Sequence, residues 1–274
     1  MKAIFSVIAG LVLLSASYAQ VPYGNNPAAG NYFNTGDANI YYEVYGSGKP
    51  LVLLHGGIFG YLTDFESLIP ELSKKYKVIA IATRGHGKSE MGQQPLSYKL
   101  FSEDACKVVR HLTADSAIVI GFSDGAIQGY YLAADHPGAV KKLIAIGGNF
   151  GATDYSDMRF INGISADFLI KNFPGIFIPR KKIMPDSSRF AEFVSKMSAV
   201  WKNEVYVNKE TISSIHCPTL IAFGESDGCP VEQYTKLYRL LKKGHLAVIP
   251  GSDHLVFLRQ PKVTSDIIWS FLDE

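Results

Sequence analysis

Cysteine is scarce in this chain. Only three of its 274 residues are cysteines, too few for a scaffold held together by disulfides. Cys217 and Cys229 flank a predicted strand of some six residues, which spans about 20 Å at about 3.3 Å per residue. A disulfide needs Cα atoms about 4 to 7 Å apart, so we expect no bridge between them. Cysteine, histidine and carboxylate residues also lack the spacing of a metal site, and no metal is expected.

The chain also has no large excess of positive or negative charge. The 27 lysine and arginine residues nearly balance the 25 acidic residues, which leaves a formal net charge of +2. Nucleic acid is therefore not an expected partner, because its binding depends on clustered positive charge. The densest basic run, residues 180–182, is interpreted as a solvated loop, with phosphate or lipid headgroup binding as the alternative. Gly-Lys-Ser at residues 87–89 resembles the end of a phosphate-binding loop, but alanine stands where that loop needs its first glycine.

No apolar run is long enough to cross a membrane. The most apolar stretch, residues 3–14, has about a dozen residues, whereas a spanning helix needs about 20. It follows a single lysine and precedes the small residues Ser17 and Ala19, which is the layout of a secretory signal peptide. We expect residues 1–19 to be removed, leaving a secreted or periplasmic protein that begins at Gln20 and has no stable membrane anchor.

The chain does have the composition of one globular domain, with 47% hydrophobic and 19% charged residues. The roughly 255 residues after the leader suit a single hydrophobic core. Apolar strand-like runs alternate with helical stretches, which predicts an α/β domain over residues 20–274, with a mostly parallel sheet and helices on both faces.

The most informative segment is Gly-Phe-Ser-Asp-Gly at residues 121–125. An apolar run, residues 117–120, precedes it, and a helical stretch of small residues, 126–134, follows it. This is the setting of a nucleophile elbow. A serine hydroxyl is a weak nucleophile until a base can reach it, and a tight turn between strand and helix exposes it. The pattern predicts Ser123 as the nucleophile of a serine hydrolase.

Two later loops offer an acid and a base. One predicted strand runs into Gly-Glu-Ser-Asp, which ends at Asp227, and the next runs into Gly-Ser-Asp-His, which ends at His254. Both loops leave the carboxyl ends of parallel strands, so they emerge at the same edge of the sheet. We predict Asp227 as the orienting acid and His254 as the base. Glu225 and Asp253 are the alternatives for the acid.

Acyl transfer also needs hydrogen-bond donors for the oxyanion. His-Gly-Gly at residues 55–57 follows a predicted strand, and a glycine there lets a backbone N–H face the substrate oxygen. A second N–H is available at the amino end of the helix that follows the elbow. We predict the N–H groups of Gly57 and Asp124 as the oxyanion hole. The alternative for the glycines is an ordinary turn at a strand end.

The order LVLLHGG, ATRGHGKS, IGFSDGA, PTLIAFGESD and GSDH resembles the α/β-hydrolase fold superfamily. The GFSDG elbow and its neighbours are most similar to the valacyclovir hydrolase, or biphenyl hydrolase-like, branch of small serine esterases. Members commonly carry Asp-x-Arg-Gly after the fourth strand, where this chain has Ala-Thr-Arg-Gly at residues 82–85. We expect that position to shape the pocket wall, and so to affect the substrate rather than the reaction.

The alternation of predicted strands and helices stops between residues 149 and 213, a segment that is rich in aromatic residues and interrupted by prolines. We expect this irregular segment to be a cap inserted over the active site, because a direct return to the sheet needs far fewer residues. Its aromatic residues would line an apolar pocket or form a small core of the cap itself. They are Phe150, Phe168, Phe173, Phe177 and Trp201.

These features predict a serine hydrolase that acts on a small-molecule carboxylic ester through an acyl-enzyme intermediate, without a cofactor. Hydrolysis of an amide, an aminoacyl group or a thioester, and acyl transfer, would use the same residues and remain alternatives. A binding protein that kept the fold and lost catalysis is disfavoured, because nucleophile, acid and base are all present.

Overall fold

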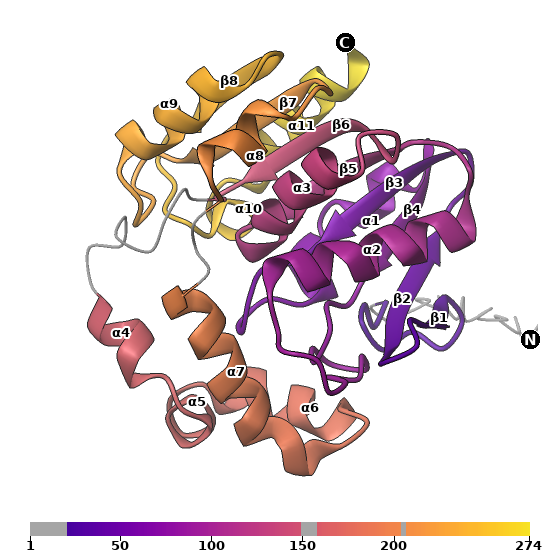
Figure 1. Ribbon diagram of the computed structural model, residues 1–274, viewed down its shortest axis with the longest axis vertical. Coiled ribbons are helices and arrows are strands. Elements are labelled where there is room, and N and C mark those ends of the chain that lie inside the picture. Colours follow the sequence, from indigo (N-terminus) through magenta and orange to yellow (C-terminus); the bar gives the residue numbers. More distant parts are fainter. Residues whose placement is uncertain (1–20, 149–157, 204–206) are drawn as a thin grey trace, which may run out of the picture.

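The computed structural model describes residues 21–148, 158–203 and 207–274 (Figure 1). An eight-stranded sheet runs through this part of the chain in the order β1-β2-β4-β3-β5-β6-β7-β8. Strand β2 is antiparallel to β1 and β4, and the other pairings are parallel. The predicted α/β class with a mostly parallel sheet is confirmed. The strands are β1 (Gly30–Asn34), β2 (Asn39–Tyr45), β3 (Lys49–Leu54), β4 (Tyr76–Ile81), β5 (Ala117–Phe122), β6 (Val140–Ile146), β7 (Thr219–Gly224) and β8 (Gly244–Ile249).

Helices cover both faces of the sheet, as predicted (Figure 1). Their buried residues belong to two separate hydrophobic clusters, one on each face. The helices that pack into the first cluster are α2 (Tyr98–Leu112), α3 (Asp124–Asp135), α8 (Lys209–Ser213) and α9 (Val231–Leu240). Those that pack into the second are η1 (Leu62–Phe65), α1 (Ile69–Leu72), α10 (Val256–Arg259) and α11 (Pro261–Asp273).

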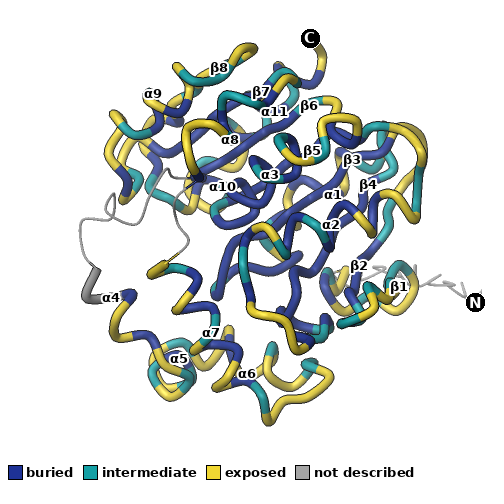
Figure 2. The backbone as a smooth tube through the Cα atoms, in the orientation of Figure 1, coloured by how far each residue is buried: buried dark blue, intermediate teal, exposed yellow. Residues whose placement is uncertain are grey.

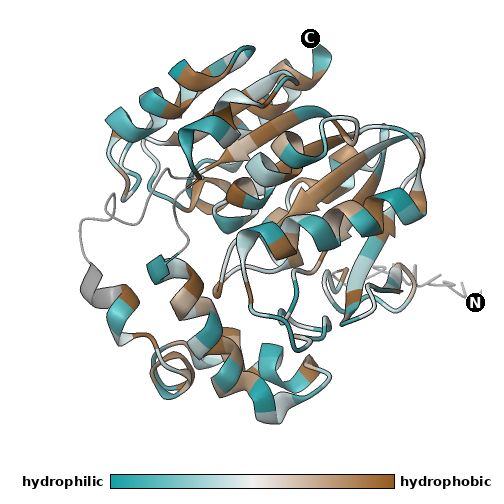
Figure 3. Cartoon of the chain, in the orientation of Figure 1, coloured by the Kyte–Doolittle hydropathy of each residue, from teal (hydrophilic) through white to brown (hydrophobic). Residues whose placement is uncertain are grey.

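Residues 51–54 of strand β3 illustrate why the buried parts of the central strands are apolar. Val52 and Leu54 pack into the first cluster, whereas Leu51 and Leu53 pack into the second. Alternate side chains point to opposite faces of a strand, so a strand covered on both sides needs an apolar residue at every position. The centre of the sheet is accordingly buried (Figure 2) and hydrophobic (Figure 3).

The turn between β5 and α3 holds the backbone in an unusual conformation at Ser123. Its φ of 54° and ψ of −120° fall where residues other than glycine are rarely found. Within the described residues, Ser123 is the one non-glycine residue with a positive φ. Its N–H donates to the carbonyl oxygen of Ile146 over 2.7 Å, which fixes the turn to the neighbouring strand β6.

Gly121 and Gly125, one on each side of Ser123, let helix α3 approach the strands closely. A Cβ at Gly125 would lie 1.9 Å from the carbonyl oxygen of Leu54, and one at Gly121 would lie 2.2 Å from the carbonyl oxygen of Gly125. Both contacts are with backbone atoms, which cannot rotate away as a side chain can. Close packing therefore requires glycine at both positions of the Gly-x-Ser-x-Gly sequence.

The insertion between β6 and β7, residues 149–213, is helical where it is described. The expectation of an irregular segment is therefore wrong. Pro174 begins a helix, where its missing N–H would have no partner in any case, and Ser165 caps the preceding helix by accepting a hydrogen bond from the N–H of Phe168. Residues 149–157, including Phe150, lie outside the described residues. The helices are α4 (Met158–Gly163), α5 (Ala166–Asn172), α6 (Pro174–Ile183), η3 (Ser187–Arg189), α7 (Phe190–Asn203) and α8.

Helices α4 to α7 lie beside one another and apart from the sheet (Figure 1). Their apolar side chains, which include Phe177, Phe190 and Phe193, pack against one another and belong to the first hydrophobic cluster. Among the described residues, no helix has the length and apolar character to cross a membrane. The leader predicted at residues 1–19 falls outside the described part of the chain.

Replacing Gly125 by alanine is expected to destabilise the protein by about 3 kcal/mol, the upper end of the usual cost of overpacking, because the new Cβ would meet backbone. Denaturant unfolding measures the change. Gly163→Ala is the matched control, since a Cβ at Gly163 would meet nothing within 4 Å. Equal unfolding midpoints for the two variants would show that the close approach of α3 to β3 does not constrain the fold.

Candidate active site

Three loops at the carboxyl ends of β5, β7 and β8 bring Ser123, Asp227 and His254 together. The Nε2 atom of His254 lies 2.9 Å from Ser123 Oγ, and its Nδ1 atom lies 3.0 Å from Asp227 Oδ2. In this geometry the Nδ1–H group donates to the carboxylate, which leaves Nε2 free to accept the serine proton. The structure thus assembles the three residues that the sequence predicts as nucleophile, acid and base.

The surroundings of His254 favour its charged form. Burial alone would lower the pKa of His254, but the hydrogen bond and the negative charge of Asp227 outweigh burial and raise that pKa above its ordinary value. The side chain of Asp227 is 4% exposed, so little solvent screens its charge. The ring of Phe122 lies against the imidazole, with 5.3 Å between the ring centres. An imidazole held in this way suits a base that becomes transiently protonated.

The two alternative acids have other partners. Glu225 accepts a hydrogen bond from the N–H of Gly251 over 2.9 Å. Asp253 accepts one from the N–H of Leu255 over 2.9 Å and one from Arg259 Nε over 3.0 Å. Both carboxylates therefore stabilise their own loops, and Asp227 is the carboxylate that contacts the imidazole.

Gly57 and Asp124, the predicted oxyanion donors, line the same cavity as Ser123. Asp124 is the first residue of α3, so its N–H belongs to the free amino end of that helix. A Cβ at Gly57 would come within 2.3 Å of Asp124 Oδ2 and 2.7 Å of Trp201 Cζ2. A larger residue at position 57 would have to displace both side chains, and this explains the second glycine of His-Gly-Gly.

The carboxylate of Asp124 connects the elbow to the insertion. It accepts a hydrogen bond from Nε1 of Trp201, on α7, over 2.7 Å. Burial raises the pKa of Asp124 to about 6, against the hydrogen bonds from Trp201 and Tyr98, which lower it. Sequence reasoning missed this contact, because it joins residues 77 positions apart with no local pattern between them.

Asp64 is a half-buried carboxylate that sequence reasoning missed. It accepts hydrogen bonds from the N–H of Gly56 over 3.0 Å and from the N–H of Tyr61 over 3.3 Å, so it holds the loop that carries Gly57. Burial raises the pKa of Asp64 to about 6, although these hydrogen bonds and Arg180 lower it. An acidic residue in the first helical turn after a glycine-rich loop is the signal that could have identified it.

A cavity of about 390 Å³ opens above Ser123, between the sheet and the insertion. Phe173 and Trp201 of the insertion line it. Phe177, by contrast, is 1% exposed and packs against Phe190 of the insertion and against Phe59 outside it, and Phe168 packs against Phe173. Both interpretations of the aromatic residues therefore hold in part, because Phe173 and Trp201 line the cavity, whereas Phe168 and Phe177 pack against other aromatic side chains.

Residues 82–85 do not line this cavity, so the expectation that they shape its wall is wrong. Ala82 is buried in the second hydrophobic cluster. Arg84 is 1% exposed and donates to both carboxylate oxygens of Asp104, over 2.7 and 2.9 Å, and to Asp37. This segment stabilises the interior through a buried ion network. Among the described residues, no group of three His, Cys, Asp or Glu side chains could hold a metal ion, and all three cysteines are free thiols.

The sheet order, the strained elbow and the loops around it define an enzyme of the hydrolase class. Residues 49–177 match the sequence model of the alpha/beta hydrolase fold family. The chain belongs to the α/β-hydrolase superfamily.

Sequence similarity to known proteins extends along most of the chain. A 2-(acetamidomethylene)succinate hydrolase of Mesorhizobium japonicum is 25% identical and covers 83% of this chain and 89% of its own. The serine hydrolase BPHL of Mus musculus is 24% identical over 85% of this chain and 83% of its own. The solved structure of Est816, described as an N-acyl homoserine lactone degrading enzyme, superposes with a TM-score of 0.71 at 25% identity and covers 88% of this chain and 99% of its own.

Asp227→Asn is expected to lower kcat by about 10⁴, because an amide favours the wrong imidazole tautomer and cannot stabilise the charged ring. Activity should rise with pH as His254 loses its proton. The midpoint of that rise should lie above 6.5, the ordinary pKa of histidine, in the parent protein and should fall in the variant, which lacks the charge that raises the pKa.

Glu225→Gln and Asp253→Asn are the matched controls for this test. Each should cost roughly tenfold or less in kcat, because neither carboxylate holds the imidazole. Glu225→Gln should leave the pH midpoint in place, whereas Asp253→Asn should lower it less than Asp227→Asn does, because the charge of Asp253 also raises the pKa of His254 but comes after the hydrogen bond and charge of Asp227. The assignment of Asp227 fails if either control loses as much activity as Asp227→Asn. pH–rate profiles of ester hydrolysis for the four proteins measure both quantities.

Proposed function

We propose that this protein is a serine-dependent carboxylic-ester hydrolase that works through an acyl-enzyme intermediate. One observation carries the proposal: the 2.9 Å distance between Ser123 Oγ and His254 Nε2, with Asp227 3.0 Å from the other ring nitrogen. A serine in this arrangement transfers its proton as it attacks a carbonyl carbon.

The reaction takes place in two halves. In the first half, Ser123 Oγ attacks the ester carbonyl while His254 takes the proton, and the N–H groups of Gly57 and Asp124 donate to the oxyanion. The tetrahedral intermediate collapses, the bond to the alcohol oxygen breaks, and His254 returns the proton to that oxygen. In the second half, a water molecule gives a proton to His254 as its oxygen attacks the acyl carbon. The bond from that carbon to Ser123 Oγ then breaks, His254 returns the proton to Oγ, and the acid leaves.

Several features support an ester as the substrate. The cavity above Ser123 is walled largely by apolar groups, including Phe59, Phe173 and Trp201, and we propose that the insertion acts as a cap that holds an apolar acyl group there. Est816 is described as degrading a lactone, which is a cyclic ester. The resemblance to BPHL, named a serine hydrolase, supports membership of the biphenyl hydrolase-like branch.

Amide hydrolysis is the second candidate. The Mesorhizobium japonicum relative is named as a hydrolase of 2-(acetamidomethylene)succinate, a compound with an acetamido group. The same serine, histidine and aspartate would act on an amide carbonyl, and His254 would then protonate a nitrogen leaving group. Parallel assays with p-nitrophenyl esters of increasing acyl length and with aminoacyl arylamides rank the two candidates.

Ser123→Ala is expected to abolish labelling by a fluorophosphonate probe and to lower kcat for p-nitrophenyl esters by a factor on the order of 10⁶. Gel fluorescence and initial-rate assays measure the two effects. Ser187→Ala, at an exposed position in η3, is the control and should behave as the parent protein does. Stoichiometric labelling of Ser123→Ala would mean that the nucleophile is another residue.

We also propose that the protein is exported through a secretory signal peptide. The support is the apolar stretch at residues 3–14 and the small residues before the predicted cut after Ala19. Mass spectrometry of the protein from its native host should therefore find a mature chain that begins at Gln20. A chain that retains Met1 would contradict this proposal.

A further inference from the structure

A second cavity, of about 210 Å³, lies next to the catalytic one. The two cavities share Asp64, Phe122 and Leu255 in their walls. Phe122 directly precedes the predicted nucleophile, and Leu255 directly follows the predicted base. The second cavity, here called the α10 groove, therefore begins where the serine and the histidine meet.

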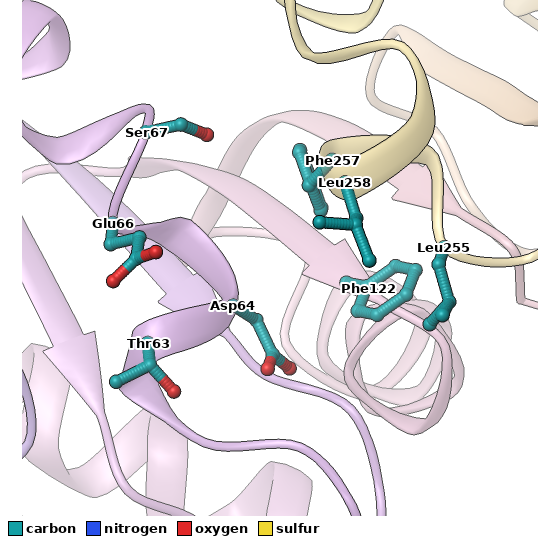
Figure 4. Close-up of a pocket in the computed structure, with 8 residues that line it drawn as sticks. All are labelled: Thr63, Asp64, Glu66, Ser67, Phe122, Leu255, Phe257 and Leu258. Carbon is teal, nitrogen blue, oxygen red and sulfur yellow. The ribbon is translucent and has the colours of Figure 1, made fainter.

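The α10 groove has two different banks, which face each other across an opening (Figure 4). One bank is polar and comes from η1 and the residues after it. The other bank is apolar and comes from the end of β5 and from α10 with the residue before it. The polar bank consists of Thr63, Asp64, Glu66 and Ser67, and the apolar bank consists of Phe122, Leu255, Phe257 and Leu258.

The apolar bank exposes large side chains to solvent. Leu258, on α10, is 70% exposed, and Leu255, between the predicted base His254 and α10, is 45% exposed. Adjacent exposed apolar residues that line a depression are typical of a ligand-binding surface. On the polar bank, Glu66 adds a negative charge and Ser67 a hydroxyl group.

The chemistry of ester cleavage determines which part of a substrate lies beside His254. The proton that leaves Ser123 is delivered by His254 Nε2 to the alcohol oxygen, so this oxygen must come within hydrogen-bond reach of Nε2. In the proposed reaction the carbonyl oxygen faces the N–H groups of Gly57 and Asp124, and the acyl chain occupies the cavity of about 390 Å³ that Trp201 of α7 lines. The alcohol then continues past the wall of Phe122 and Leu255, which is the wall of the α10 groove.

We propose that the α10 groove is the leaving-group subsite of this hydrolase, and that it takes an alcohol with an apolar face and a positively charged or hydrogen-bond-donating end. The apolar face packs on Leu255 and Leu258, and the charged end meets Glu66. In the cleavage step the C–O bond breaks, its electron pair stays on the alcohol oxygen, and that oxygen takes the proton from His254. This subsite rests on the proposed ester hydrolysis.

Two acetate esters with the same acyl group test the subsite. One carries a 4-(trimethylammoniomethyl)phenyl leaving group, and the other carries its neutral counterpart, a 4-neopentylphenyl group. Methyl acetate serves as the reference, because its leaving group is too short to extend into the groove. Comparing the ratio of kcat/KM values between variants cancels the intrinsic difference in reactivity between the two aryl esters.

Leu258→Ala should lower kcat/KM for both aryl esters by about threefold, the effect of removing roughly one methylene of apolar contact, and should leave methyl acetate unchanged. Glu66→Gln should lower the kcat/KM of the cationic ester relative to that of the neutral ester by about threefold, as expected for the loss of a solvent-exposed charge pair. Leu246→Ala on β8 and Glu71→Gln on α1 remove an exposed leucine and an exposed glutamate outside the groove, and should change neither quantity.

The outcomes separate the subsite from the proposed function. The subsite is overturned if the protein hydrolyses the esters but kcat/KM changes equally in Leu258→Ala and Leu246→Ala, and equally in Glu66→Gln and Glu71→Gln. The proposed ester hydrolase would be unaffected by that result. A protein that neither hydrolyses these esters nor reacts with a fluorophosphonate probe overturns both.

Discussion

The approach of α3 to β3 is the contact on which the rest of the site depends. The backbone of Gly125 lies so close to the carbonyl oxygen of Leu54 that no Cβ fits between them. This contact forces the sharp turn that gives Ser123 its positive φ, and the turn directs the hydroxyl group out of the sheet. The same approach places the amino end of α3 beside the loop of Gly57, so the nucleophile and both predicted oxyanion donors depend on this contact, together with the bonds that hold the turn to β6 and the loop to Asp64.

Much of the fold could be predicted because its signals are local. A strand covered on both faces is almost entirely apolar, as in β5, and helix α2 has the spacing and the serine cap that mark its start. The predicted nucleophile, acid and base follow the same logic, because each stands just past the carboxyl end of a strand. Parallel strands bring their carboxyl ends to one edge, so the order of these loops along the chain was enough to place Ser123, Asp227 and His254 near one another.

What could not be predicted depends on contacts between distant segments. The hydrogen bonds from Trp201 to Asp124 and from the N–H of Gly56 to Asp64 have no periodic pattern in the sequence. The helices of the insertion were missed for a different reason. Their prolines, Pro174 and Pro179, were interpreted as breaks, although one begins α6 and the other lies within it, where packing against neighbouring helices outweighs the lost backbone hydrogen bond.

The bond between Trp201 and Asp124 has a further consequence. The indole of Trp201 lines the cavity and also occupies the space that a Cβ at position 57 would need. Moving α7 outward to admit a bulkier molecule would therefore remove a hydrogen-bond donor from the buried carboxylate of Asp124, at a cost of about 1 to 3 kcal/mol, next to the N–H group of the proposed oxyanion hole. Under the proposed mechanism, a broader substrate range would therefore come with weaker stabilisation of the transition state.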